Sequence, residues 1–171
     1  MKDINSVDFS KINFVLMDCD GVLTDGSLLY MPNGDVIKNF HAHDGYGIER
    51  GHHHGLKFAI ISGRKAEANK HRAERLKIEE LYEDCKDKCS AAEEITKKYN
   101  IRFENFCYIG DDSFDIPLLE RVAFSCAPPE AVEDVRAAVH YITKIHAGKG
   151  CVREVIDMIL KKQGKIQMSE K

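Results

Sequence analysis

The sequence predicts an α/β fold, a Rossmann-like three-layer α/β/α sandwich built on a mostly parallel sheet. Short apolar runs alternate with longer amphipathic stretches from start to finish, and this alternation is typical of strands joined by crossover helices. The 171 residues suffice for a single domain with a core of its own. We expect one domain over residues 1–162, followed by a flexible polar tail over residues 163–171.

The six predicted strands are the apolar runs, and the predicted helices are the amphipathic stretches between them. The first strand, 12–17, leads through a hairpin into a helix at 45–53. The remaining strands and helices then follow in pairs: 57–62 with 65–76, 79–82 with 89–99, 106–110 with 115–121, 122–125 with 130–137, and 139–142 with 151–162. This order predicts helices on both faces of the sheet.

One segment, residues 27–40, departs from the alternation. Two β-prone runs, 27–31 and 35–40, are joined around Asn33-Gly34, which is the strongest short signal for a β-hairpin. The hairpin is too apolar to extend freely into water, so it must pack on its own sheet or on another subunit. The apolar residues are Leu28, Leu29, Tyr30, Val36, Ile37 and Phe40.

Composition and charge exclude several classes of function. Hydrophobic residues make up 43% and charged residues 31% of the chain, as in an ordinary globular protein. The net charge of -3 provides no general attraction to nucleic acid or to anionic lipid. The first residues lack an apolar signal-peptide core, and no apolar run approaches membrane-spanning length. We therefore expect a cytoplasmic protein with neither nucleic-acid nor membrane partners.

The cysteine and histidine residues do not predict a metal site. The six cysteines form no C-x-x-C pair, so we expect them to be reduced and structural. His52, His53 and His54 are consecutive, and consecutive side chains on a helix point in different directions. The triplet is better interpreted as a solvated helix end.

Two pairs of acidic residues carry the strongest functional signal. Asp18 and Asp20 follow the first strand, and Asp111 and Asp112 follow the strand predicted at 106–110. The carboxyl ends of parallel strands form the edge where α/β sheets bind ligands. Carboxylates gathered there repel one another unless a cation neutralises them, and oxygen ligands favour Mg²⁺. Asp18 and Asp20 reach a common target only if the chain turns at Gly21.

Polar residues at the other strand ends indicate phosphate binding. Ser62 and Gly63 precede the helix predicted from Lys65, where free N–H groups attract an anion, although Ser62 could simply cap that helix. Lys88 begins the next helix, an unusual end for a cation unless it holds an anion, and Lys86 is a competing candidate. Asp115 has two interpretations, as a helix cap or as a functional acid.

In this order the motifs resemble those of the haloacid dehalogenase superfamily of phosphohydrolases. The matching segments are Asp18-x-Asp20-Gly21-Val22-x-Thr24, Ser62-Gly63, Lys88 and Gly110-Asp111-Asp112-x-x-Asp115. The resemblance covers about residues 12–160. It implies that Asp18 is the nucleophile that becomes an aspartyl phosphate and that Asp20 is the acid and base.

The resemblance also implies a complete set of ligands. Mg²⁺ would be held by Asp18, the backbone carbonyl of Asp20, and Asp111. Asp112 would either contact these ligands or bind the metal through a water molecule, and Asp115 would contact the ligands. Ser62, Gly63 and Lys88 would bind the phosphate. An anionic nucleophile that attacks an anionic phosphate needs this neutralisation first. Only 41 residues separate Asp20 from Ser62, and 25 separate Ser62 from Lys88, so there is no room for a cap domain beyond the hairpin.

A closer resemblance concerns the 3-deoxy-D-manno-octulosonate 8-phosphate phosphatase subfamily. It is carried by residues 20–26, 40–48 and 148–154 and by Ser62-Gly63-Arg64. Members are small homotetramers in which a neighbour's hairpin helps to cover the active site. The similarity implies release of phosphate from a phosphorylated sugar acid, a step towards lipopolysaccharide.

The same resemblance suggests substrate contacts. Arg64 is the best local partner for the sugar carboxylate, because a guanidinium binds a carboxylate with two hydrogen bonds. A surface salt bridge of Arg64 is the alternative interpretation. Lys149, which is flanked by glycines, could reach a neighbouring active site or sit in a turn. His43 stands where the subfamily often has Arg, which weakens the choice of substrate more than the choice of reaction.

Three alternatives remain from the sequence. The first is a phosphatase for a nine-carbon sugar acid 9-phosphate of the sialic acid type, against which Arg64 argues. The second is a receiver-like signalling domain, although receivers place a single acceptor Asp after the third strand, and here the acidic pair recurs after the fourth. The third is a non-catalytic subunit, which the complete set of reactive residues disfavours.

Overall fold

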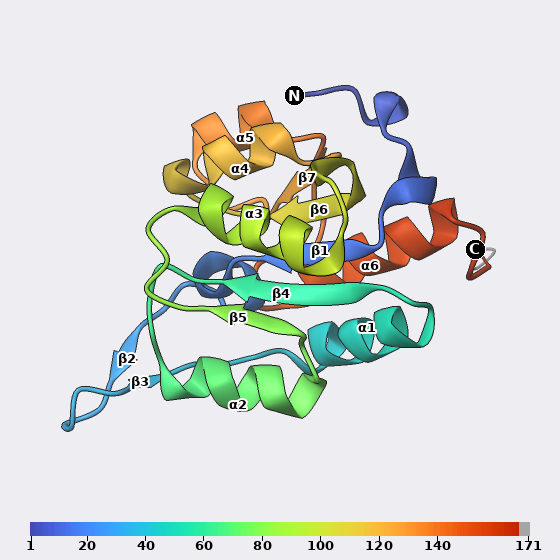
Figure 1. Cartoon of the computed structure of the whole chain (residues 1–171). Helices are drawn as coiled ribbons and strands as arrows, with labels where there is room; N and C mark the ends of the chain where they lie inside the picture. The colour runs from blue at the N-terminus through green and yellow to red at the C-terminus, as the bar shows by residue number, and fades with distance from the viewer. Residues whose placement is uncertain (168–171) are drawn as a thin grey trace.

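The computed structural model describes residues 1–167 and contains a six-stranded parallel sheet (Figure 1). The strand order is β5-β4-β1-β6-β7-β8, and every pairing is parallel. The predicted α/β fold and sheet are confirmed. The strands are β1 (Phe14–Met17), β4 (Lys57–Ile61), β5 (Glu80–Tyr82), β6 (Phe106–Ile109), β7 (Phe124–Ala127) and β8 (Tyr141–Ile142).

Helices cover both faces of the sheet, as predicted. Alternate residues of β1 enter different cores: Val15 packs in the core shared with α1, α2 and α6, and Leu16 packs in the core shared with α3, α4 and α5. Figure 1 shows these two helical layers on opposite sides of the strands. The helices are α1 (Ala42–His53), α2 (Glu67–Leu76), α3 (Lys88–Tyr99), α4 (Ile116–Arg121), α5 (Glu133–Ala138) and α6 (Cys151–Lys162).

The sheet register places the two acidic loops side by side. β1 lies between β4 and β6, with Met17 paired to Ile109. The ladder continues one residue further, because the Asp18 N–H donates to the carbonyl of Ile109 over 3.0 Å. Asp18 and the residues after Ile109 therefore leave the sheet together, at the point where the strand order reverses.

Most element boundaries agree with the sequence within a few residues, and the exceptions have local causes. α1 begins three residues earlier than predicted because the His41 side chain accepts a hydrogen bond from the His43 N–H and caps the helix. α5 begins three residues later because Ala131 N–H closes a turn onto the carbonyl of Pro128. β7 lies two residues later than predicted.

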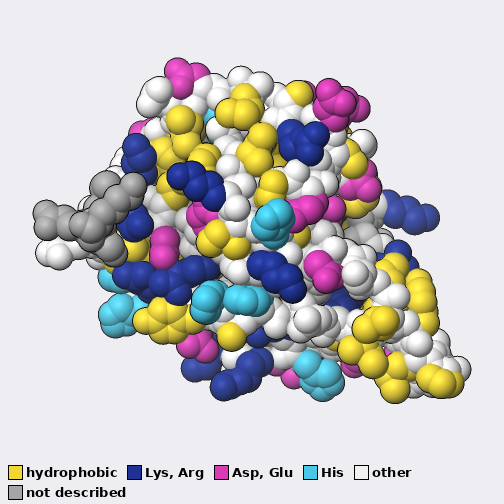
Figure 2. Space-filling model, turned by 180° about the vertical axis from the view of Figure 1, so that it is seen from behind, with side chains coloured by type: hydrophobic (Ala, Val, Ile, Leu, Met, Phe, Trp, Pro, Cys, Tyr) yellow, Lys and Arg dark blue, Asp and Glu magenta, His cyan; other side chains and the backbone are white. Residues whose placement is uncertain are grey.

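The predicted hairpin is present as β2 (Leu29–Tyr30) and β3 (Val36–Ile37), which pair antiparallel. Gly34, with φ of 88°, closes the turn. The hairpin projects from the layered body (Figure 1), and apolar side chains gather on it (Figure 2). Leu29 is 63% and Ile37 52% exposed, so the alternative in which the hairpin packs on its own sheet is wrong for these strands.

The remaining expectations concern the termini, the cysteines and the histidines. Within residues 1–167, no helix is both long and apolar enough to cross a bilayer, and all six cysteines are free. The Gln163 side chain donates to the carbonyls of Phe9 and Ile12. Of the predicted tail 163–171, residues 168–171 lie outside the described residues. His52, His53 and His54 lie at the C-terminal end of α1, and the ring of His52 lies 3.1 Å from the carbonyl of Leu76.

Candidate active site

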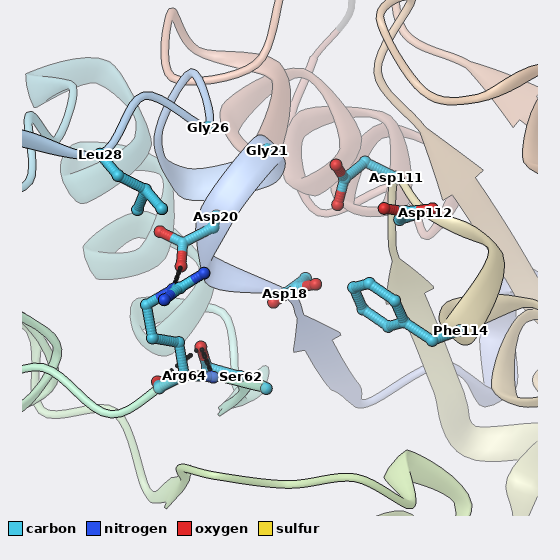
Figure 3. A pocket seen from close by; sticks show the side chains of 11 residues that line it. Asp18, Asp20, Gly21, Gly26, Leu28, Ser62, Arg64, Asp111, Asp112 and Phe114 are labelled. Atoms are coloured by element: carbon cyan, nitrogen blue, oxygen red, sulfur yellow. Dashed lines mark hydrogen bonds and ion pairs between the residues drawn. The ribbon is translucent and has the colours of Figure 1, made fainter.

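A cavity of about 320 Å³ opens at the carboxyl ends of β1, β4 and β6. Figure 3 shows Asp20 and Arg64 on one side of Asp18, and Asp111, Asp112 and Phe114 on the other. The position confirms that the acidic pairs meet at one edge of the sheet. The lining residues are Asp18, Asp20, Gly21, Gly26, Leu28, Ser62, Gly63, Arg64, Asp111, Asp112 and Phe114.

The first acidic loop turns at Gly21, as the sequence required. After β1 the chain forms a single tight turn over Cys19–Leu23, in which Gly21 has φ of 83°. A Cβ atom at Gly21 would overlap the carboxylate of Asp111. Glycine is therefore needed for two reasons, the left-handed backbone and the close approach of the second acidic loop. The Asp18 side chain accepts a hydrogen bond from the Cys19 N–H over 2.6 Å.

Lys88 is buried beneath Asp18 and links three side chains. Its Nζ atom lies 2.6 Å from Asp18 Oδ2, 2.6 Å from Asp115 Oδ1 and 3.1 Å from the Tyr108 hydroxyl. Lys86 is exposed. The structure therefore places Lys88, and not Lys86, at the site. Its position at the first residue of α3 is compatible with the helix dipole because two carboxylates compensate the ammonium charge.

Asp115 is a buried organiser of the second acidic loop. Its Oδ2 atom accepts hydrogen bonds from the N–H groups of Asp111 (2.9 Å) and Asp112 (3.2 Å), and its Oδ1 atom binds Lys88 and the Tyr108 hydroxyl. Asp115 occupies the N-cap position of α4, but its side chain makes no capping hydrogen bond to that helix. It forms a capping box with Asp112 on the 3-10 turn Ser113–Asp115 that leads into α4. Asp112 accepts from the N–H of Ser113.

The carboxylates of Asp18, Asp111 and Asp115 form the group within the described residues that is suited to a metal ion. One oxygen of each lies within 4.8 Å of the others. Burial is the main cause that raises the pKa of Asp18 to about 6. Burial, followed by the charges of Asp18 and Asp115, raises the pKa of Asp111 to about 8. Bringing these acids together without a counter-charge is thus unfavourable.

A divalent cation fits this arrangement. Asp111 Oδ1 is buried and lacks a hydrogen-bond partner among the described residues, so it is available as a ligand. Asp115 is already fully hydrogen-bonded, which leaves Asp18 and Asp111 as the carboxylate ligands. Oxygen donors of this kind match Mg²⁺.

The loop after β4 places Ser62 and Gly63 at the cavity, but not for the reason predicted. Ser62 is buried, and its hydroxyl donates to the carbonyl of Arg64 over 2.9 Å. α2 begins at Glu67, two residues later than predicted, and the Ala66 N–H donates to Glu83. The interpretation of Ser62 as the cap of α2 is therefore wrong, and the α2 N-terminus is already compensated by Glu83.

Asp20 lies between two cations. Arg64 Nε is 3.7 Å from Asp20 Oδ2, and Lys38 Nζ is 2.8 Å from Asp20 Oδ1. Sequence reasoning missed Lys38, which follows β3 and reads as an ordinary surface residue of the hairpin. It also missed Tyr108, whose hydroxyl is hidden in an apolar strand, and Phe114, which lines the cavity.

His43 and Lys149 lie elsewhere on the chain surface. Both are exposed, and the cavity lining, among the described residues, includes neither. The Cβ atom of His43 would meet a Cβ placed on Gly150 at 3.6 Å, so the two predicted substrate residues belong to neighbouring segments. A single chain does not bring them to its own cavity.

Comparison with known proteins agrees with the geometry. A family model described as haloacid dehalogenase-like hydrolase matches residues 77–156. The 3-deoxy-D-manno-octulosonate 8-phosphate phosphatase KdsC of Escherichia coli K12 is 39% identical over 155 residues, which cover 91% of this chain and 82% of that protein.

Two solved structures are also similar. The phosphatase of the same name from Moraxella catarrhalis, in complex with magnesium ion, phosphate ion and KDO, has a TM-score of 0.88 at 36% identity and covers 91% of this chain and 90% of its own. The cobalt-bound phosphatase of Haemophilus influenzae has a TM-score of 0.88 at 39% identity and covers 92% of both chains. The chain therefore belongs to the haloacid dehalogenase-like hydrolases, in the family of the 3-deoxy-D-manno-octulosonate 8-phosphate phosphatases.

Proposed function

We propose that this chain is a Mg²⁺-dependent phosphomonoesterase that hydrolyses 3-deoxy-D-manno-octulosonate 8-phosphate to the free sugar acid and phosphate. The observation that carries the proposal is the position of Asp18, buried at the cavity floor with Oδ2 held 2.6 Å from Lys88 Nζ. The identity to the curated phosphatases supports the choice of ester. The nine-carbon 9-phosphate is not favoured, because these relatives bear the name of the eight-carbon ester.

In the first step Asp18 acts as the nucleophile. Its carboxylate, with a pKa of about 6, is mostly ionised at neutral pH. An oxygen of Asp18 forms a bond to phosphorus while the bond from phosphorus to the sugar O8 breaks, and Asp20 gives its proton to the departing oxygen. Lys88 and Ser62 bind phosphoryl oxygens in this assignment, and Gly63 lets the loop approach them.

In the second step water releases the phosphate. Asp20, now a carboxylate, takes a proton from the water as its oxygen bonds to phosphorus and the bond from Asp18 to phosphorus breaks. The acid and the base are thus the same side chain, used in sequence. Asp115 and Tyr108 hold Lys88 in place through both steps, and Asp112 supports the second acidic loop.

Mg²⁺ would be held by the carboxylates of Asp18 and Asp111 and by the backbone carbonyl of Asp20. When bound, it supplies positive charge against the nucleophile and the phosphoryl oxygens, which are all anionic.

The substrate contacts and the assembly are part of the proposal. Arg64, 48% exposed at the mouth of the cavity, is placed to bind the sugar carboxylate. We assign His43 and Lys149 to a neighbour's cavity within a homotetramer, in which the exposed hairpin covers the adjoining site. The cytoplasmic location stays a prediction from the sequence.

The test is phosphate release from the eight-carbon and nine-carbon esters with Mg²⁺. We expect preference for 3-deoxy-D-manno-octulosonate 8-phosphate, and loss of at least about 10⁴-fold in kcat when Asp18→Asn removes the nucleophile. Asp8→Asn, a change at an exposed acid, is the matched control. Retained turnover in Asp18→Asn would contradict the mechanism, and preference for the nine-carbon ester would contradict the choice of substrate.

A further inference from the structure

Lys38 occupies a position that is unusual for a lysine. Its neighbours in the hairpin, Ile37 and Asn39, are exposed, but its own side chain is 0% exposed. Lysines are almost never fully buried unless they are paired, and here the pair is with Asp20 at 2.8 Å. The Cys19 Sγ atom lies 3.5 Å from the same ammonium. The chain thus turns one lysine of the hairpin inward, against the first acidic loop.

The two oxygens of Asp20 have different surroundings as a result. Oδ1 is buried and faces Lys38, which approaches as an ion pair outside the direction of an aligned hydrogen bond. Oδ2 faces Arg64 at 3.7 Å, at the cavity. Arg64 is half-exposed and also lies 3.5 Å from the Tyr30 hydroxyl. The buried contact is therefore fixed by packing, and the other contact is open to solvent.

This difference matters for an acid that must deliver one proton to one atom. The terminal torsion of an aspartate is broad and nearly two-fold, so an unrestrained Asp20 could exchange its two oxygens. General acid catalysis requires a proton within hydrogen-bond reach of the leaving oxygen. A cation fixed on Oδ1 removes the exchange and leaves Oδ2 as the oxygen that carries the proton.

We infer that Lys38 is a positioning residue for Asp20: its buried ammonium holds Oδ1 at the base of the hairpin and keeps Oδ2 directed to the departing sugar oxygen. The inference rests on the proposed function, in which Asp20 is the acid and base. In the first step the proton on Oδ2 moves to the sugar O8 as its bond to phosphorus breaks. The Lys38 ammonium stays against Oδ1 throughout, next to a neutral carboxyl group before the transfer and paired with a carboxylate after it. Because Lys38 directly follows β3, the hairpin is linked to the chemistry by a side chain of its own.

The test compares two leaving groups in Lys38→Met. The sugar oxygen needs a proton as it departs, whereas p-nitrophenolate leaves as a stable anion. The value of kcat/KM reports only the steps up to release of the leaving group. Its ratio between the two esters therefore isolates the effect of proton donation to that group. We expect the ratio of kcat/KM for the sugar ester to that for p-nitrophenyl phosphate to fall about tenfold or more. Lys70→Met, an exposed lysine on α2, should keep the wild-type ratio.

A double-mutant cycle separates positioning from a general structural role. If Lys38 acts through Asp20, then Asp20→Asn combined with Lys38→Met is no slower than Asp20→Asn alone, within about twofold. Multiplicative losses in the double variant would overturn the inference. So would an unchanged leaving-group ratio in a folded Lys38→Met protein, as judged by its thermal unfolding.

The outcomes also distinguish this inference from the proposed function. If the wild-type protein releases phosphate from neither ester, the proposed function fails. If the wild type is active and the Lys38→Met ratio is unchanged, only the role of Lys38 fails. Lys38→Leu is made in parallel, because either apolar variant that folds gives the answer.

Discussion

The floor of the cavity and the projecting hairpin differ in whether their side chains find partners within the same chain. At the floor, Asp18 and Asp115 share the ammonium of Lys88, and all three are buried within one chain. In the hairpin, Leu29 and Ile37 pair across two short strands but remain more than half exposed. The fold of a single chain therefore positions the reactive groups, whereas it leaves the apolar side chains of the hairpin uncovered.

Lys88 is the residue at which chemistry and folding are most tightly coupled. Lys88→Met removes the cation between two buried carboxylates, and such a loss costs about 3–5 kcal/mol of unfolding free energy. We also expect kcat/KM to fall at least about 10³-fold, because the phosphoryl oxygens lose a fixed charge. Chemical denaturation and steady-state kinetics measure the two effects.

The matched control is Lys86→Met, which changes an exposed lysine two residues earlier. It should alter the unfolding free energy by less than about 0.5 kcal/mol and leave turnover intact. A Lys88→Met protein as stable as the wild type would mean that the floor is not held together by this ion pair, and the contrast with the hairpin would weaken.

The sheet and the acidic edge of the cavity could be predicted from the sequence, whereas other residues of the site depend on tertiary packing. Apolar runs that end in Asp18 and Asp111 predicted both the sheet and the acidic edge, because strand ends and ligand sites coincide in parallel sheets. Lys38 and Tyr108 were missed because nothing local distinguishes a buried lysine in a hairpin, or a hydroxyl in an apolar strand, from its ordinary counterpart.

Two further interpretations failed because a distant residue took over a local role. The sequence left open that Ser62 and Asp115 act as helix caps, since those residue types often fill that position. In the structure, Glu83 accepts the Ala66 N–H near the start of α2, and Asp115 is used by Lys88 and by the second acidic loop. Which residue fills such a role depends on its neighbours in three dimensions, and residue spacing does not encode them.

Asp111 offers a way to separate stability from activity at the floor. Its pKa is raised to about 8, first by burial and then by neighbouring acids, against about 3.9 in an unfolded chain. Between these values the folded state holds a proton that the unfolded state has lost, so the stability of the metal-free protein falls as pH rises. Asp111→Asn has no proton to lose, and it should be the more stable protein by about 1–3 kcal/mol near pH 8.

Thermal unfolding in EDTA at pH 5, 6.5 and 8 checks this sign. The gain should be largest at pH 8, where about 2–10 °C is expected for a chain of this size, and smallest at pH 5. Mg²⁺ should stabilise the wild type but not Asp111→Asn, which lacks the carboxylate ligand. Asp134→Asn, an exposed acid in α5, serves as control. A less stable Asp111→Asn in metal-free buffer at pH 8 would show that the carboxylate is compensated within the chain.

Of the changes considered, those in the hairpin should have the smallest effect on the unfolding free energy but a clear effect on assembly. Leu29→Ser with Ile37→Ser removes two exposed apolar side chains that face each other across β2 and β3. Each change should alter the unfolding free energy of the monomer by less than about 0.5 kcal/mol, because neither side chain is buried in its own chain. Sedimentation should show the proposed homotetramer replaced by smaller species, and Val132→Ser, a change at an exposed apolar residue outside the hairpin, should leave it intact. A loss of several kcal/mol in the monomer would place the hairpin among the elements that hold the fold. Unchanged assembly would mean that the exposed apolar strands are not the surface that joins one copy to the next.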